Sequence, residues 1–292
     1  MESQKIKLYK RRDFSQKISI TIDYIRENFA GLIKAMLIII IPFGLLYALV
    51  MSSFFGAFGE MVQNPNQNPV MSTGAFAGIG MSYLVMIISM LVAYALIIAS
   101  IYTYIKEKDQ GNVYQPVELI KRSAGKVPGI IGLLILTGLV SLIGMLLFIL
   151  PGIYLAVALS IAIPVYVFEG VSVGAAFTKS FKLINGKWWS TFGLLFITGL
   201  IAGVISYIFA IPMYILMFGE MFANQEALVS NPESVYEIFT SWYSSLSMAL
   251  VMVGSFCTYM IPMIALSFQY FNLSERKEGT GLKQQIQDFE NL

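Results

Sequence analysis

The sequence predicts an all-α membrane protein with six membrane-spanning helices paired as three hairpins and with amphipathic helices on the cytoplasmic side. The composition is the first reason, because 57% of the residues are hydrophobic and only 12% are charged, against about 25% charged in soluble domains. The second is a set of apolar runs long enough to cross a bilayer. The third is that Lys and Arg, apart from Lys34 just inside the start of the first run, occur only in alternate segments outside those runs.

Six apolar runs define the predicted spans. Their approximate ranges are 32–55, 79–105, 129–150, 153–168, 190–216 and 246–271. A helix needs about 20 residues to cross, so the fourth span is short. Leu150, Pro151 and Gly152 are expected to form a tight outer turn that makes the third and fourth spans a hairpin. Because no large polar block interrupts these runs, residues 1–292 are predicted to form a single integral membrane domain.

The distribution of Lys and Arg fixes the predicted orientation. Bases occur before the first span, between the second and third, between the fourth and fifth, and in the tail, whereas segments 56–78 and 217–245 have none. Short Lys/Arg-rich segments stay in the cytoplasm during insertion. Both termini are therefore expected inside, with Asn68 outside and Lys283 inside.

Four segments beside the spans have amphipathic patterns: about 13–29, 116–126, 172–184 and 281–290. In the first, an apolar residue recurs every three or four positions, at Phe14, Ile18, Ile22, Ile25 and Phe29. Such helices lie in a membrane interface, although packing on the inner end of the bundle remains an alternative. A surface helix followed by two spans occurs three times, which suggests an internal threefold repeat.

Four prolines lie within the spans: Pro42, Pro164, Pro212 and Pro262. Proline removes a backbone hydrogen bond, and a broken helix in lipid usually faces protein or a water-filled cavity. Two interpretations remain open. The prolines are static kinks, or Pro164 and Pro262 open their helices around a binding cavity.

Aromatic and basic residues flank the inner start of the fifth span. Trp188 and Trp189 fit the aromatic belt of a membrane interface. Lys179 and Lys182 lie on the polar face of the preceding amphipathic segment and are predicted to anchor it at the interface. Gly186 is a plausible cap for that helix.

The residue inventory argues against catalysis. The chain has no histidine and one cysteine, so Ser-His-Asp and Cys-His arrangements are excluded, and no cofactor or metal site is expected. The spans carry no ionisable residue near their centres, which argues against proton-coupled transport. The inward bases are expected to face anionic lipid headgroups. The exterior loops carry acids and no base, so nucleic acid is not an expected partner.

One run of about fifty residues, from Leu150 to Gly199, carries a recognisable pattern. It has LPGIY at the turn, then Pro164, Glu169 and Gly170; Ala176, Ser180, Gly186 and Trp189 follow. This pattern resembles the membrane-domain family of glycerophosphoryl diester phosphodiesterase, which includes bacterial integral membrane proteins of unknown function. The resemblance implies a shared scaffold in a bacterial inner membrane, without the phosphodiesterase domain.

The sequence thus predicts a non-enzymatic inner-membrane protein that organises lipid or scaffolds a membrane protein partner. The alternative is a transporter or translocator of a lipidic or uncharged substrate, with a cavity at the proline-broken helices. A packed centre around Pro164 and Pro262 would argue against that alternative.

Overall fold

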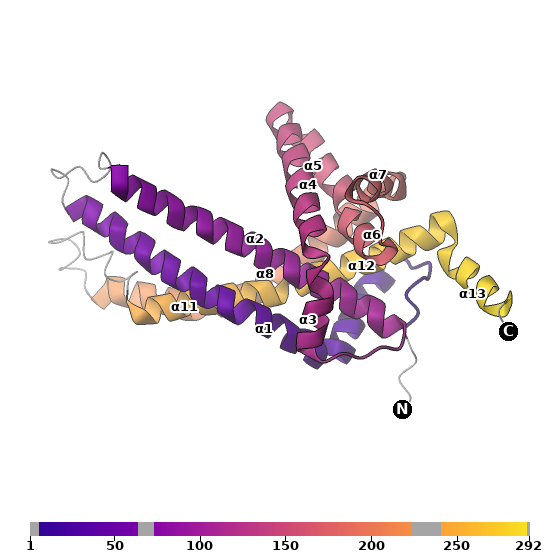
Figure 1. Ribbon diagram of the computed structural model, residues 1–292, viewed down its shortest axis with the longest axis horizontal. Coiled ribbons are helices and arrows are strands. Elements are labelled where there is room, and N and C mark those ends of the chain that lie inside the picture. The colour runs from indigo at the N-terminus through magenta and orange to yellow at the C-terminus, as the bar shows by residue number, and fades with distance from the viewer. Residues whose placement is uncertain (1–5, 64–72, 224–240, 291–292) are drawn as a thin grey trace. The chain divides into compact units, whose positions relative to one another are not determined.

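The computed structural model describes residues 6–63, 73–223 and 241–290 (Figure 1). Within these ranges every regular element is a helix. Six helical stretches are long and apolar enough to cross a membrane: Phe14–Phe54, Gly80–Asp109, Val127–Leu147, Ile149–Glu169, Trp188–Ala223 and Trp242–Glu278. The predicted all-α membrane class is therefore confirmed, whereas the threefold repeat stays a prediction. Asn68, used above for orientation, lies outside the described residues.

The helices follow the predicted order. They are α1 (Phe14–Gln63), α2 (Thr73–Asp109), α3 (Pro116–Ala124), α4 (Val127–Leu147), α5 (Ile149–Leu159), α6 (Ala162–Glu169), α7 (Val173–Ile184), α8 (Trp188–Ala223), α11 (Trp242–Thr258), α12 (Met260–Glu278) and α13 (Thr280–Glu290). The amphipathic segments expected at 116–126, 172–184 and 281–290 correspond to α3, α7 and α13. The segment expected at 13–29 instead continues into the first span as α1. Gly31 lies within this continuous helix. A Cβ there would lie 2.8 Å from the Tyr104 hydroxyl, so the glycine permits α1 to pack closely against α2.

The chain divides into two compact units. One comprises residues 1–36, 95–202 and 259–292, and the other residues 37–94 and 203–258. All nineteen Lys and Arg residues belong to the first unit. We call the first the basic unit and the second the base-free unit.

The core of the basic unit is built around α12. This helix is buried on every side from Ile264 to Ser274, as expected for a helix enclosed by neighbours. It packs against α6 and α7, and α4 packs along α5. The Phe168 ring stacks on Tyr270 with centroids 5.4 Å apart, which joins α6 to α12.

The base-free unit is held by small residues and hydroxyl groups. A Cβ at Gly254 would lie 2.1 Å from the Phe209 ring, and one at Gly44 would meet Val253 at 3.5 Å. Ser206 and Thr258 share a hydrogen bond between their hydroxyls. Small residues of this kind let membrane helices approach closely.

The turn between α4 and α5 differs from the prediction. The chain reverses at Phe148, whose backbone is extended, and Pro151 and Gly152 lie in the first turn of α5. Proline is tolerated there because its missing N–H would have no partner in the helix. Gly152 packs against α4, since a Cβ would lie 2.6 Å from the backbone nitrogen of Met145. The glycine therefore serves helix packing and not a turn.

The four prolines fall into two pairs. Pro42 and Pro212 lie inside the continuous helices α1 and α8. Pro164 and Pro262 are each the third residue of a helix that begins after a break, at Ser160–Ile161 and at Tyr259. Both are buried, as are their neighbours Ala162, Val165, Met260 and Ile264. This packing gives no support to a translocation cavity at these two breaks.

Candidate functional site

A polar face of α1 is buried in the basic unit. Its members recur at steps of four, three and four residues and are at most 4% exposed: Lys17, Thr21, Tyr24 and Asn28. The apolar face expected from the sequence is more open, with Phe14, Ile22 and Phe29 exposed by 37–48%. The start of α1 therefore places polar groups against the protein and leaves apolar side chains uncovered.

Lys17 is the centre of a hydrogen-bond network that joins three helices. Its Nζ donates to Ser190 Oγ in α8 and to Gln269 Oε1 in α12, both at 2.7 Å. The Gln269 amide then donates to Thr191 Oγ1 at 2.8 Å. All of these acceptors are neutral, so hydrogen bonds replace the water that the ammonium loses on burial. The helical period placed Lys17 on a polar face, but which helices cover that face is a tertiary property.

Arg12 holds the segment before α1 in place. Its guanidinium donates to the carbonyl of Leu8 at 2.8 Å and also contacts the carbonyls of Lys7 and Lys10. Its backbone N–H donates to Asn272 Oδ1 at 2.8 Å. Burial lowers the pKa of Arg12 from its ordinary value, because a low dielectric disfavours the charged form.

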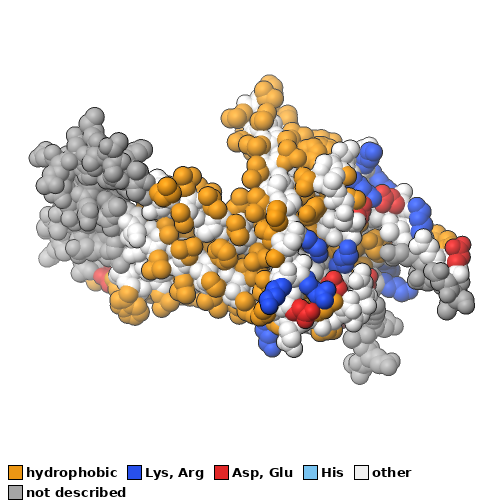
Figure 2. All heavy atoms as spheres, viewed as in Figure 1, with side chains coloured by type: hydrophobic (Ala, Val, Ile, Leu, Met, Phe, Trp, Pro, Cys, Tyr) orange, Lys and Arg blue, Asp and Glu red, His pale blue; other side chains and the backbone are white. Residues whose placement is uncertain are grey.

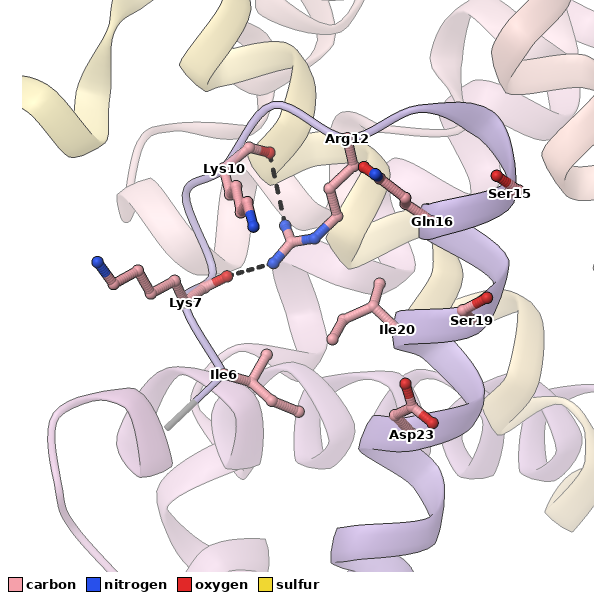
Figure 3. Close-up of a pocket in the computed structure, with 9 residues that line it drawn as sticks. All are labelled: Ile6, Lys7, Lys10, Arg12, Ser15, Gln16, Ser19, Ile20 and Asp23. Atoms are coloured by element: carbon pink, nitrogen blue, oxygen red, sulfur yellow. Dashed lines mark hydrogen bonds between the residues drawn. The ribbon is translucent and has the colours of Figure 1, made fainter. Parts of the chain in front are cut away.

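A cavity of about 990 Å³ lies between this segment and the first turns of α1 (Figure 3). Its lining residues are Ile6, Lys7, Lys10, Arg12, Ser15, Gln16, Ser19, Ile20 and Asp23. Lys7 and Lys10 are exposed, whereas Arg12 is buried. Three cations and one carboxylate line the cavity, so its formal charge is positive.

An ion-pair cluster joins α6, α7 and α12. Lys179 Nζ lies 2.9 Å from Glu169 Oε2 and 2.8 Å from Glu278 Oε1, and the Tyr270 hydroxyl donates to Glu169 Oε1 at 2.9 Å. Burial disfavours the charged form of Lys179, but hydrogen bonds and charges from Glu278 and Glu169 outweigh it and raise the pKa of Lys179. The structure thus places this predicted interface anchor in contacts within the protein. Lys182, the other predicted anchor, is exposed.

The residues of the fifty-residue pattern gather around α5, α6 and α7. Gly170 and Gly186 have φ of +68° and +74°, which residues with a Cβ rarely adopt. Ser180 Oγ donates to the carbonyl of Ala158 at 2.7 Å, which lies beside the break between α5 and α6. Ala176 is fully buried. These residues are structural in the arrangement that the chain adopts.

The two tryptophans differ in their surroundings. Trp188 Nε1 donates to the carbonyl of Tyr154 at 3.1 Å, and the two rings stack with centroids 5.8 Å apart. Trp189 is 77% exposed. One indole thus fastens α8 to α5, while the other is available to an interface.

Within the described residues there is no group of three or more His, Cys, Asp or Glu placed to hold a metal ion. The described side chains of the basic unit offer charge and hydrogen bonding. Its exposed cations include the ammonium groups of Lys7 and Lys10 at the cavity and of Lys182 on α7.

Comparison with protein-family models matches residues 126–288 to the membrane domain of glycerophosphoryl diester phosphodiesterase. The matched residues are more than half of the chain and extend beyond the fifty-residue pattern on both sides. No curated protein and no solved structure matches the chain.

Proposed function

Because the chain belongs to the family of the membrane domain of glycerophosphoryl diester phosphodiesterase, we propose that it is a non-enzymatic membrane protein that binds and organises anionic lipids. The matched family describes the membrane part of such proteins and not the catalytic part. The proposed location is the bacterial inner membrane, with both termini in the cytoplasm. The alternation of Lys/Arg-rich and Lys/Arg-free segments supports that orientation.

The cavity lined by Lys7, Lys10 and Arg12 is the observation that carries this proposal. A lipid phosphate there gains attraction from the exposed ammonium groups, worth about 1 kcal/mol for each base near an anionic surface. The hydroxyls of Ser15 and Ser19 line the same cavity and provide neutral donors.

The charged side chains around the cavity have different roles. The Arg12 guanidinium donates hydrogen bonds to backbone carbonyls of the segment before α1 (Figure 3). It therefore stabilises the segment that forms one wall of the cavity. Lys7 and Lys10 are exposed and supply mobile charge to the headgroup. Asp23 also lines the cavity and repels an anion, so the headgroup is expected on the side of Lys7 and Lys10.

Native mass spectrometry of protein extracted gently with its membrane tests the proposal. We expect one anionic phospholipid at fixed stoichiometry in the wild type and its loss in the double variant K7Q/K10Q. The matched control is K121Q, which removes an exposed lysine of α3 outside the cavity lining. That control should retain the lipid.

Two results would overturn the proposal. One is bulk lipid alone on the wild-type protein, without a fixed stoichiometry. The other is a co-purifying membrane protein that binds equally well to the K7Q/K10Q variant, which would indicate a scaffold for a protein partner.

A further inference from the structure

The hairpin of α4 and α5 ends in an uncovered apolar tip. Five consecutive apolar side chains are 69–78% exposed there: Leu146, Leu147, Phe148, Ile149 and Leu150. The two helices pack closely below it, because Gly144 and Gly152 meet with almost no space for a Cβ. Figure 2 shows the hydrophobic surface of this tip projecting from the basic unit. Such a patch is stable only against an apolar partner.

The tip is close in space to the start of α8. Tyr154, whose carbonyl accepts a hydrogen bond from the Trp188 indole, comes six residues after Phe148. Six helical residues cover only about 9 Å at 1.5 Å per residue. The tip therefore lies within about 9 Å, along α5, of the level of Trp188.

Lysines mark that level as a water interface. Lys187 immediately precedes Trp188 and is exposed, as is Lys182 in the last turn of α7. Helix α7, which carries Lys182, packs along α5 and α6, with the hydroxyl of Ser180 bonded to Ala158 in α5. Charged side chains at the centre of a bilayer are strongly disfavoured, so this stretch of α5 lies near the surface.

The other end of the same segment also meets a lysine. Lys106 Nζ donates to the carbonyl of Phe168 at the end of α6, at 3.1 Å. The stretch from Tyr154 to Phe168 thus has Lys106 at one end and, at the other, Trp188, which Lys187 precedes in the sequence. A crossing helix would need its ends about 30 Å apart along the membrane normal.

We propose that the α4–α5 hairpin does not cross the membrane and that its tip inserts into the acyl chains of the leaflet on the Lys/Arg-bearing side. The occupant of the apolar tip is lipid, because Lys182 and Lys187 and the indole of Trp189 provide the interfacial contacts that flank such an insertion. Four of the six apolar stretches then cross the membrane, and the charge alternation is unchanged, since the turn carries no base. The proposal is independent of headgroup binding in the cavity.

Cysteine labelling in sealed vesicles tests the insertion. Cys257 is the only thiol, so single cysteines are placed in a C257A background. N68C and K283C report the two faces. With a membrane-impermeant maleimide, F148C is expected to react from neither face, and to react fully after detergent is added.

A second variant determines which leaflet contains the hairpin tip. A six-residue Gly-Ser insertion with one central cysteine, placed after Phe148, reaches the nearer aqueous face. We expect it to react only from the face on which K283C reacts. Reaction of F148C or of this insertion from the N68C face would show a crossing hairpin and overturn the proposal. A disulfide between two copies at F148C would overturn lipid as the occupant.

These labels also separate this proposal from lipid binding. Loss of the bound phospholipid in K7Q/K10Q with an unchanged labelling pattern supports both. A labelling pattern that shows a crossing hairpin refutes the proposed insertion of the hairpin and leaves the proposal of lipid binding standing. An unchanged lipid stoichiometry in K7Q/K10Q refutes lipid binding in the cavity and leaves the proposed insertion standing.

Discussion

The basic unit and the base-free unit achieve stability by different means. The basic unit contains every Lys and Arg, and it contains the helix breaks that precede Pro164 and Pro262. Its buried and half-buried side chains form hydrogen-bond and ion-pair networks around Lys17 and Lys179. The base-free unit depends on close contacts such as Gly254 with Phe209 and on a hydroxyl–hydroxyl bond between Ser206 of α8 and Thr258 of α11. In the first, buried polar groups join the helices in addition to close glycine packing, whereas close packing is the main described contact in the second. Comparing matched substitutions in the two units tests this difference.

The largest expected effect is at the helix contacts of the two units. G152A should destabilise the protein by about 3 kcal/mol, at the upper end of overpacking costs, because its Cβ meets the backbone of Met145. G254A should cost a similar amount, since its Cβ meets Cγ and Cβ of Phe209 at 2.1 and 2.4 Å, at the root of a side chain that cannot move aside without shifting its helix. The measurement is the free energy of unfolding in detergent, from denaturant titration followed by circular dichroism.

G138A is the matched control, because nothing lies within 4 Å of a Cβ at that position of α4. Its effect should be near zero or slightly stabilising. An equal loss in G138A and G152A would mean that the packing at Gly152 is not what limits the hairpin.

The buried lysine comes next. K17M should cost about 2–3 kcal/mol, because it leaves the buried acceptor of Gln269 and the half-buried hydroxyl of Ser190 without their donor. The double variant K17M/Q269M should cost less than the sum of the single changes, since both partners of one bond are then apolar. The readout is again the free energy of unfolding.

K182Q removes an exposed lysine of the same unit and should change stability by less than about 0.5 kcal/mol. Strict additivity of K17M and Q269M would contradict the network. The comparison therefore separates buried bases from exposed ones within one unit.

The Glu169–Lys179–Glu278 cluster predicts a pH dependence. K179Q should lose about 1–2 kcal/mol, the size of a charge-assisted hydrogen bond. The pKa of Lys179 is raised in the folded state, so the stability difference from K179Q is fully present below the ordinary lysine pKa of 10.5 and is lost as pH rises through the folded pKa. Thermal unfolding of both proteins between neutral and alkaline pH measures this.

K179R keeps a positive charge at every pH used, so it should keep its advantage over K179Q where the wild type loses it. If the wild type and K179Q differ equally at all pH values, the ionisation of Lys179 does not contribute to the stability.

The sequence predicted the helices better than their contacts. Hydropathy and the positions of bases located the six apolar stretches, and periodicity located α3, α7 and α13, because these patterns depend on local chemistry. The turn at Phe148 was missed, since Pro151 and Gly152 are common in turns and also suit the first turn of a closely packed helix. The hydrogen-bond partners of Lys17 could not be predicted, because the pattern that defines a helical face does not identify the helix that packs against it.

The same limit applies to Glu169 and Lys179. The resemblance identified Glu169 as part of a pattern, and the amphipathic face identified Lys179 as a candidate lipid anchor. Only the return of α7 along α6 brings the two together, with Glu278 approaching from α12. Residues far apart in sequence acquire a shared role through tertiary packing, which periodicity does not record.

The smallest effect is expected at the hydroxyl pair of the base-free unit. S206A should cost about 0.5–1 kcal/mol, because Thr258 Oγ1 keeps a second bond, to the carbonyl of Ser255 at 2.9 Å. Its counterpart in the basic unit is S180A, which leaves the carbonyl of Ala158 without its 2.7 Å donor beside a helix break. S180A should therefore be the more destabilising of the two in the same unfolding titration. A larger loss in S206A would mean that hydroxyl bonds, and not close packing, determine the stability of the base-free unit.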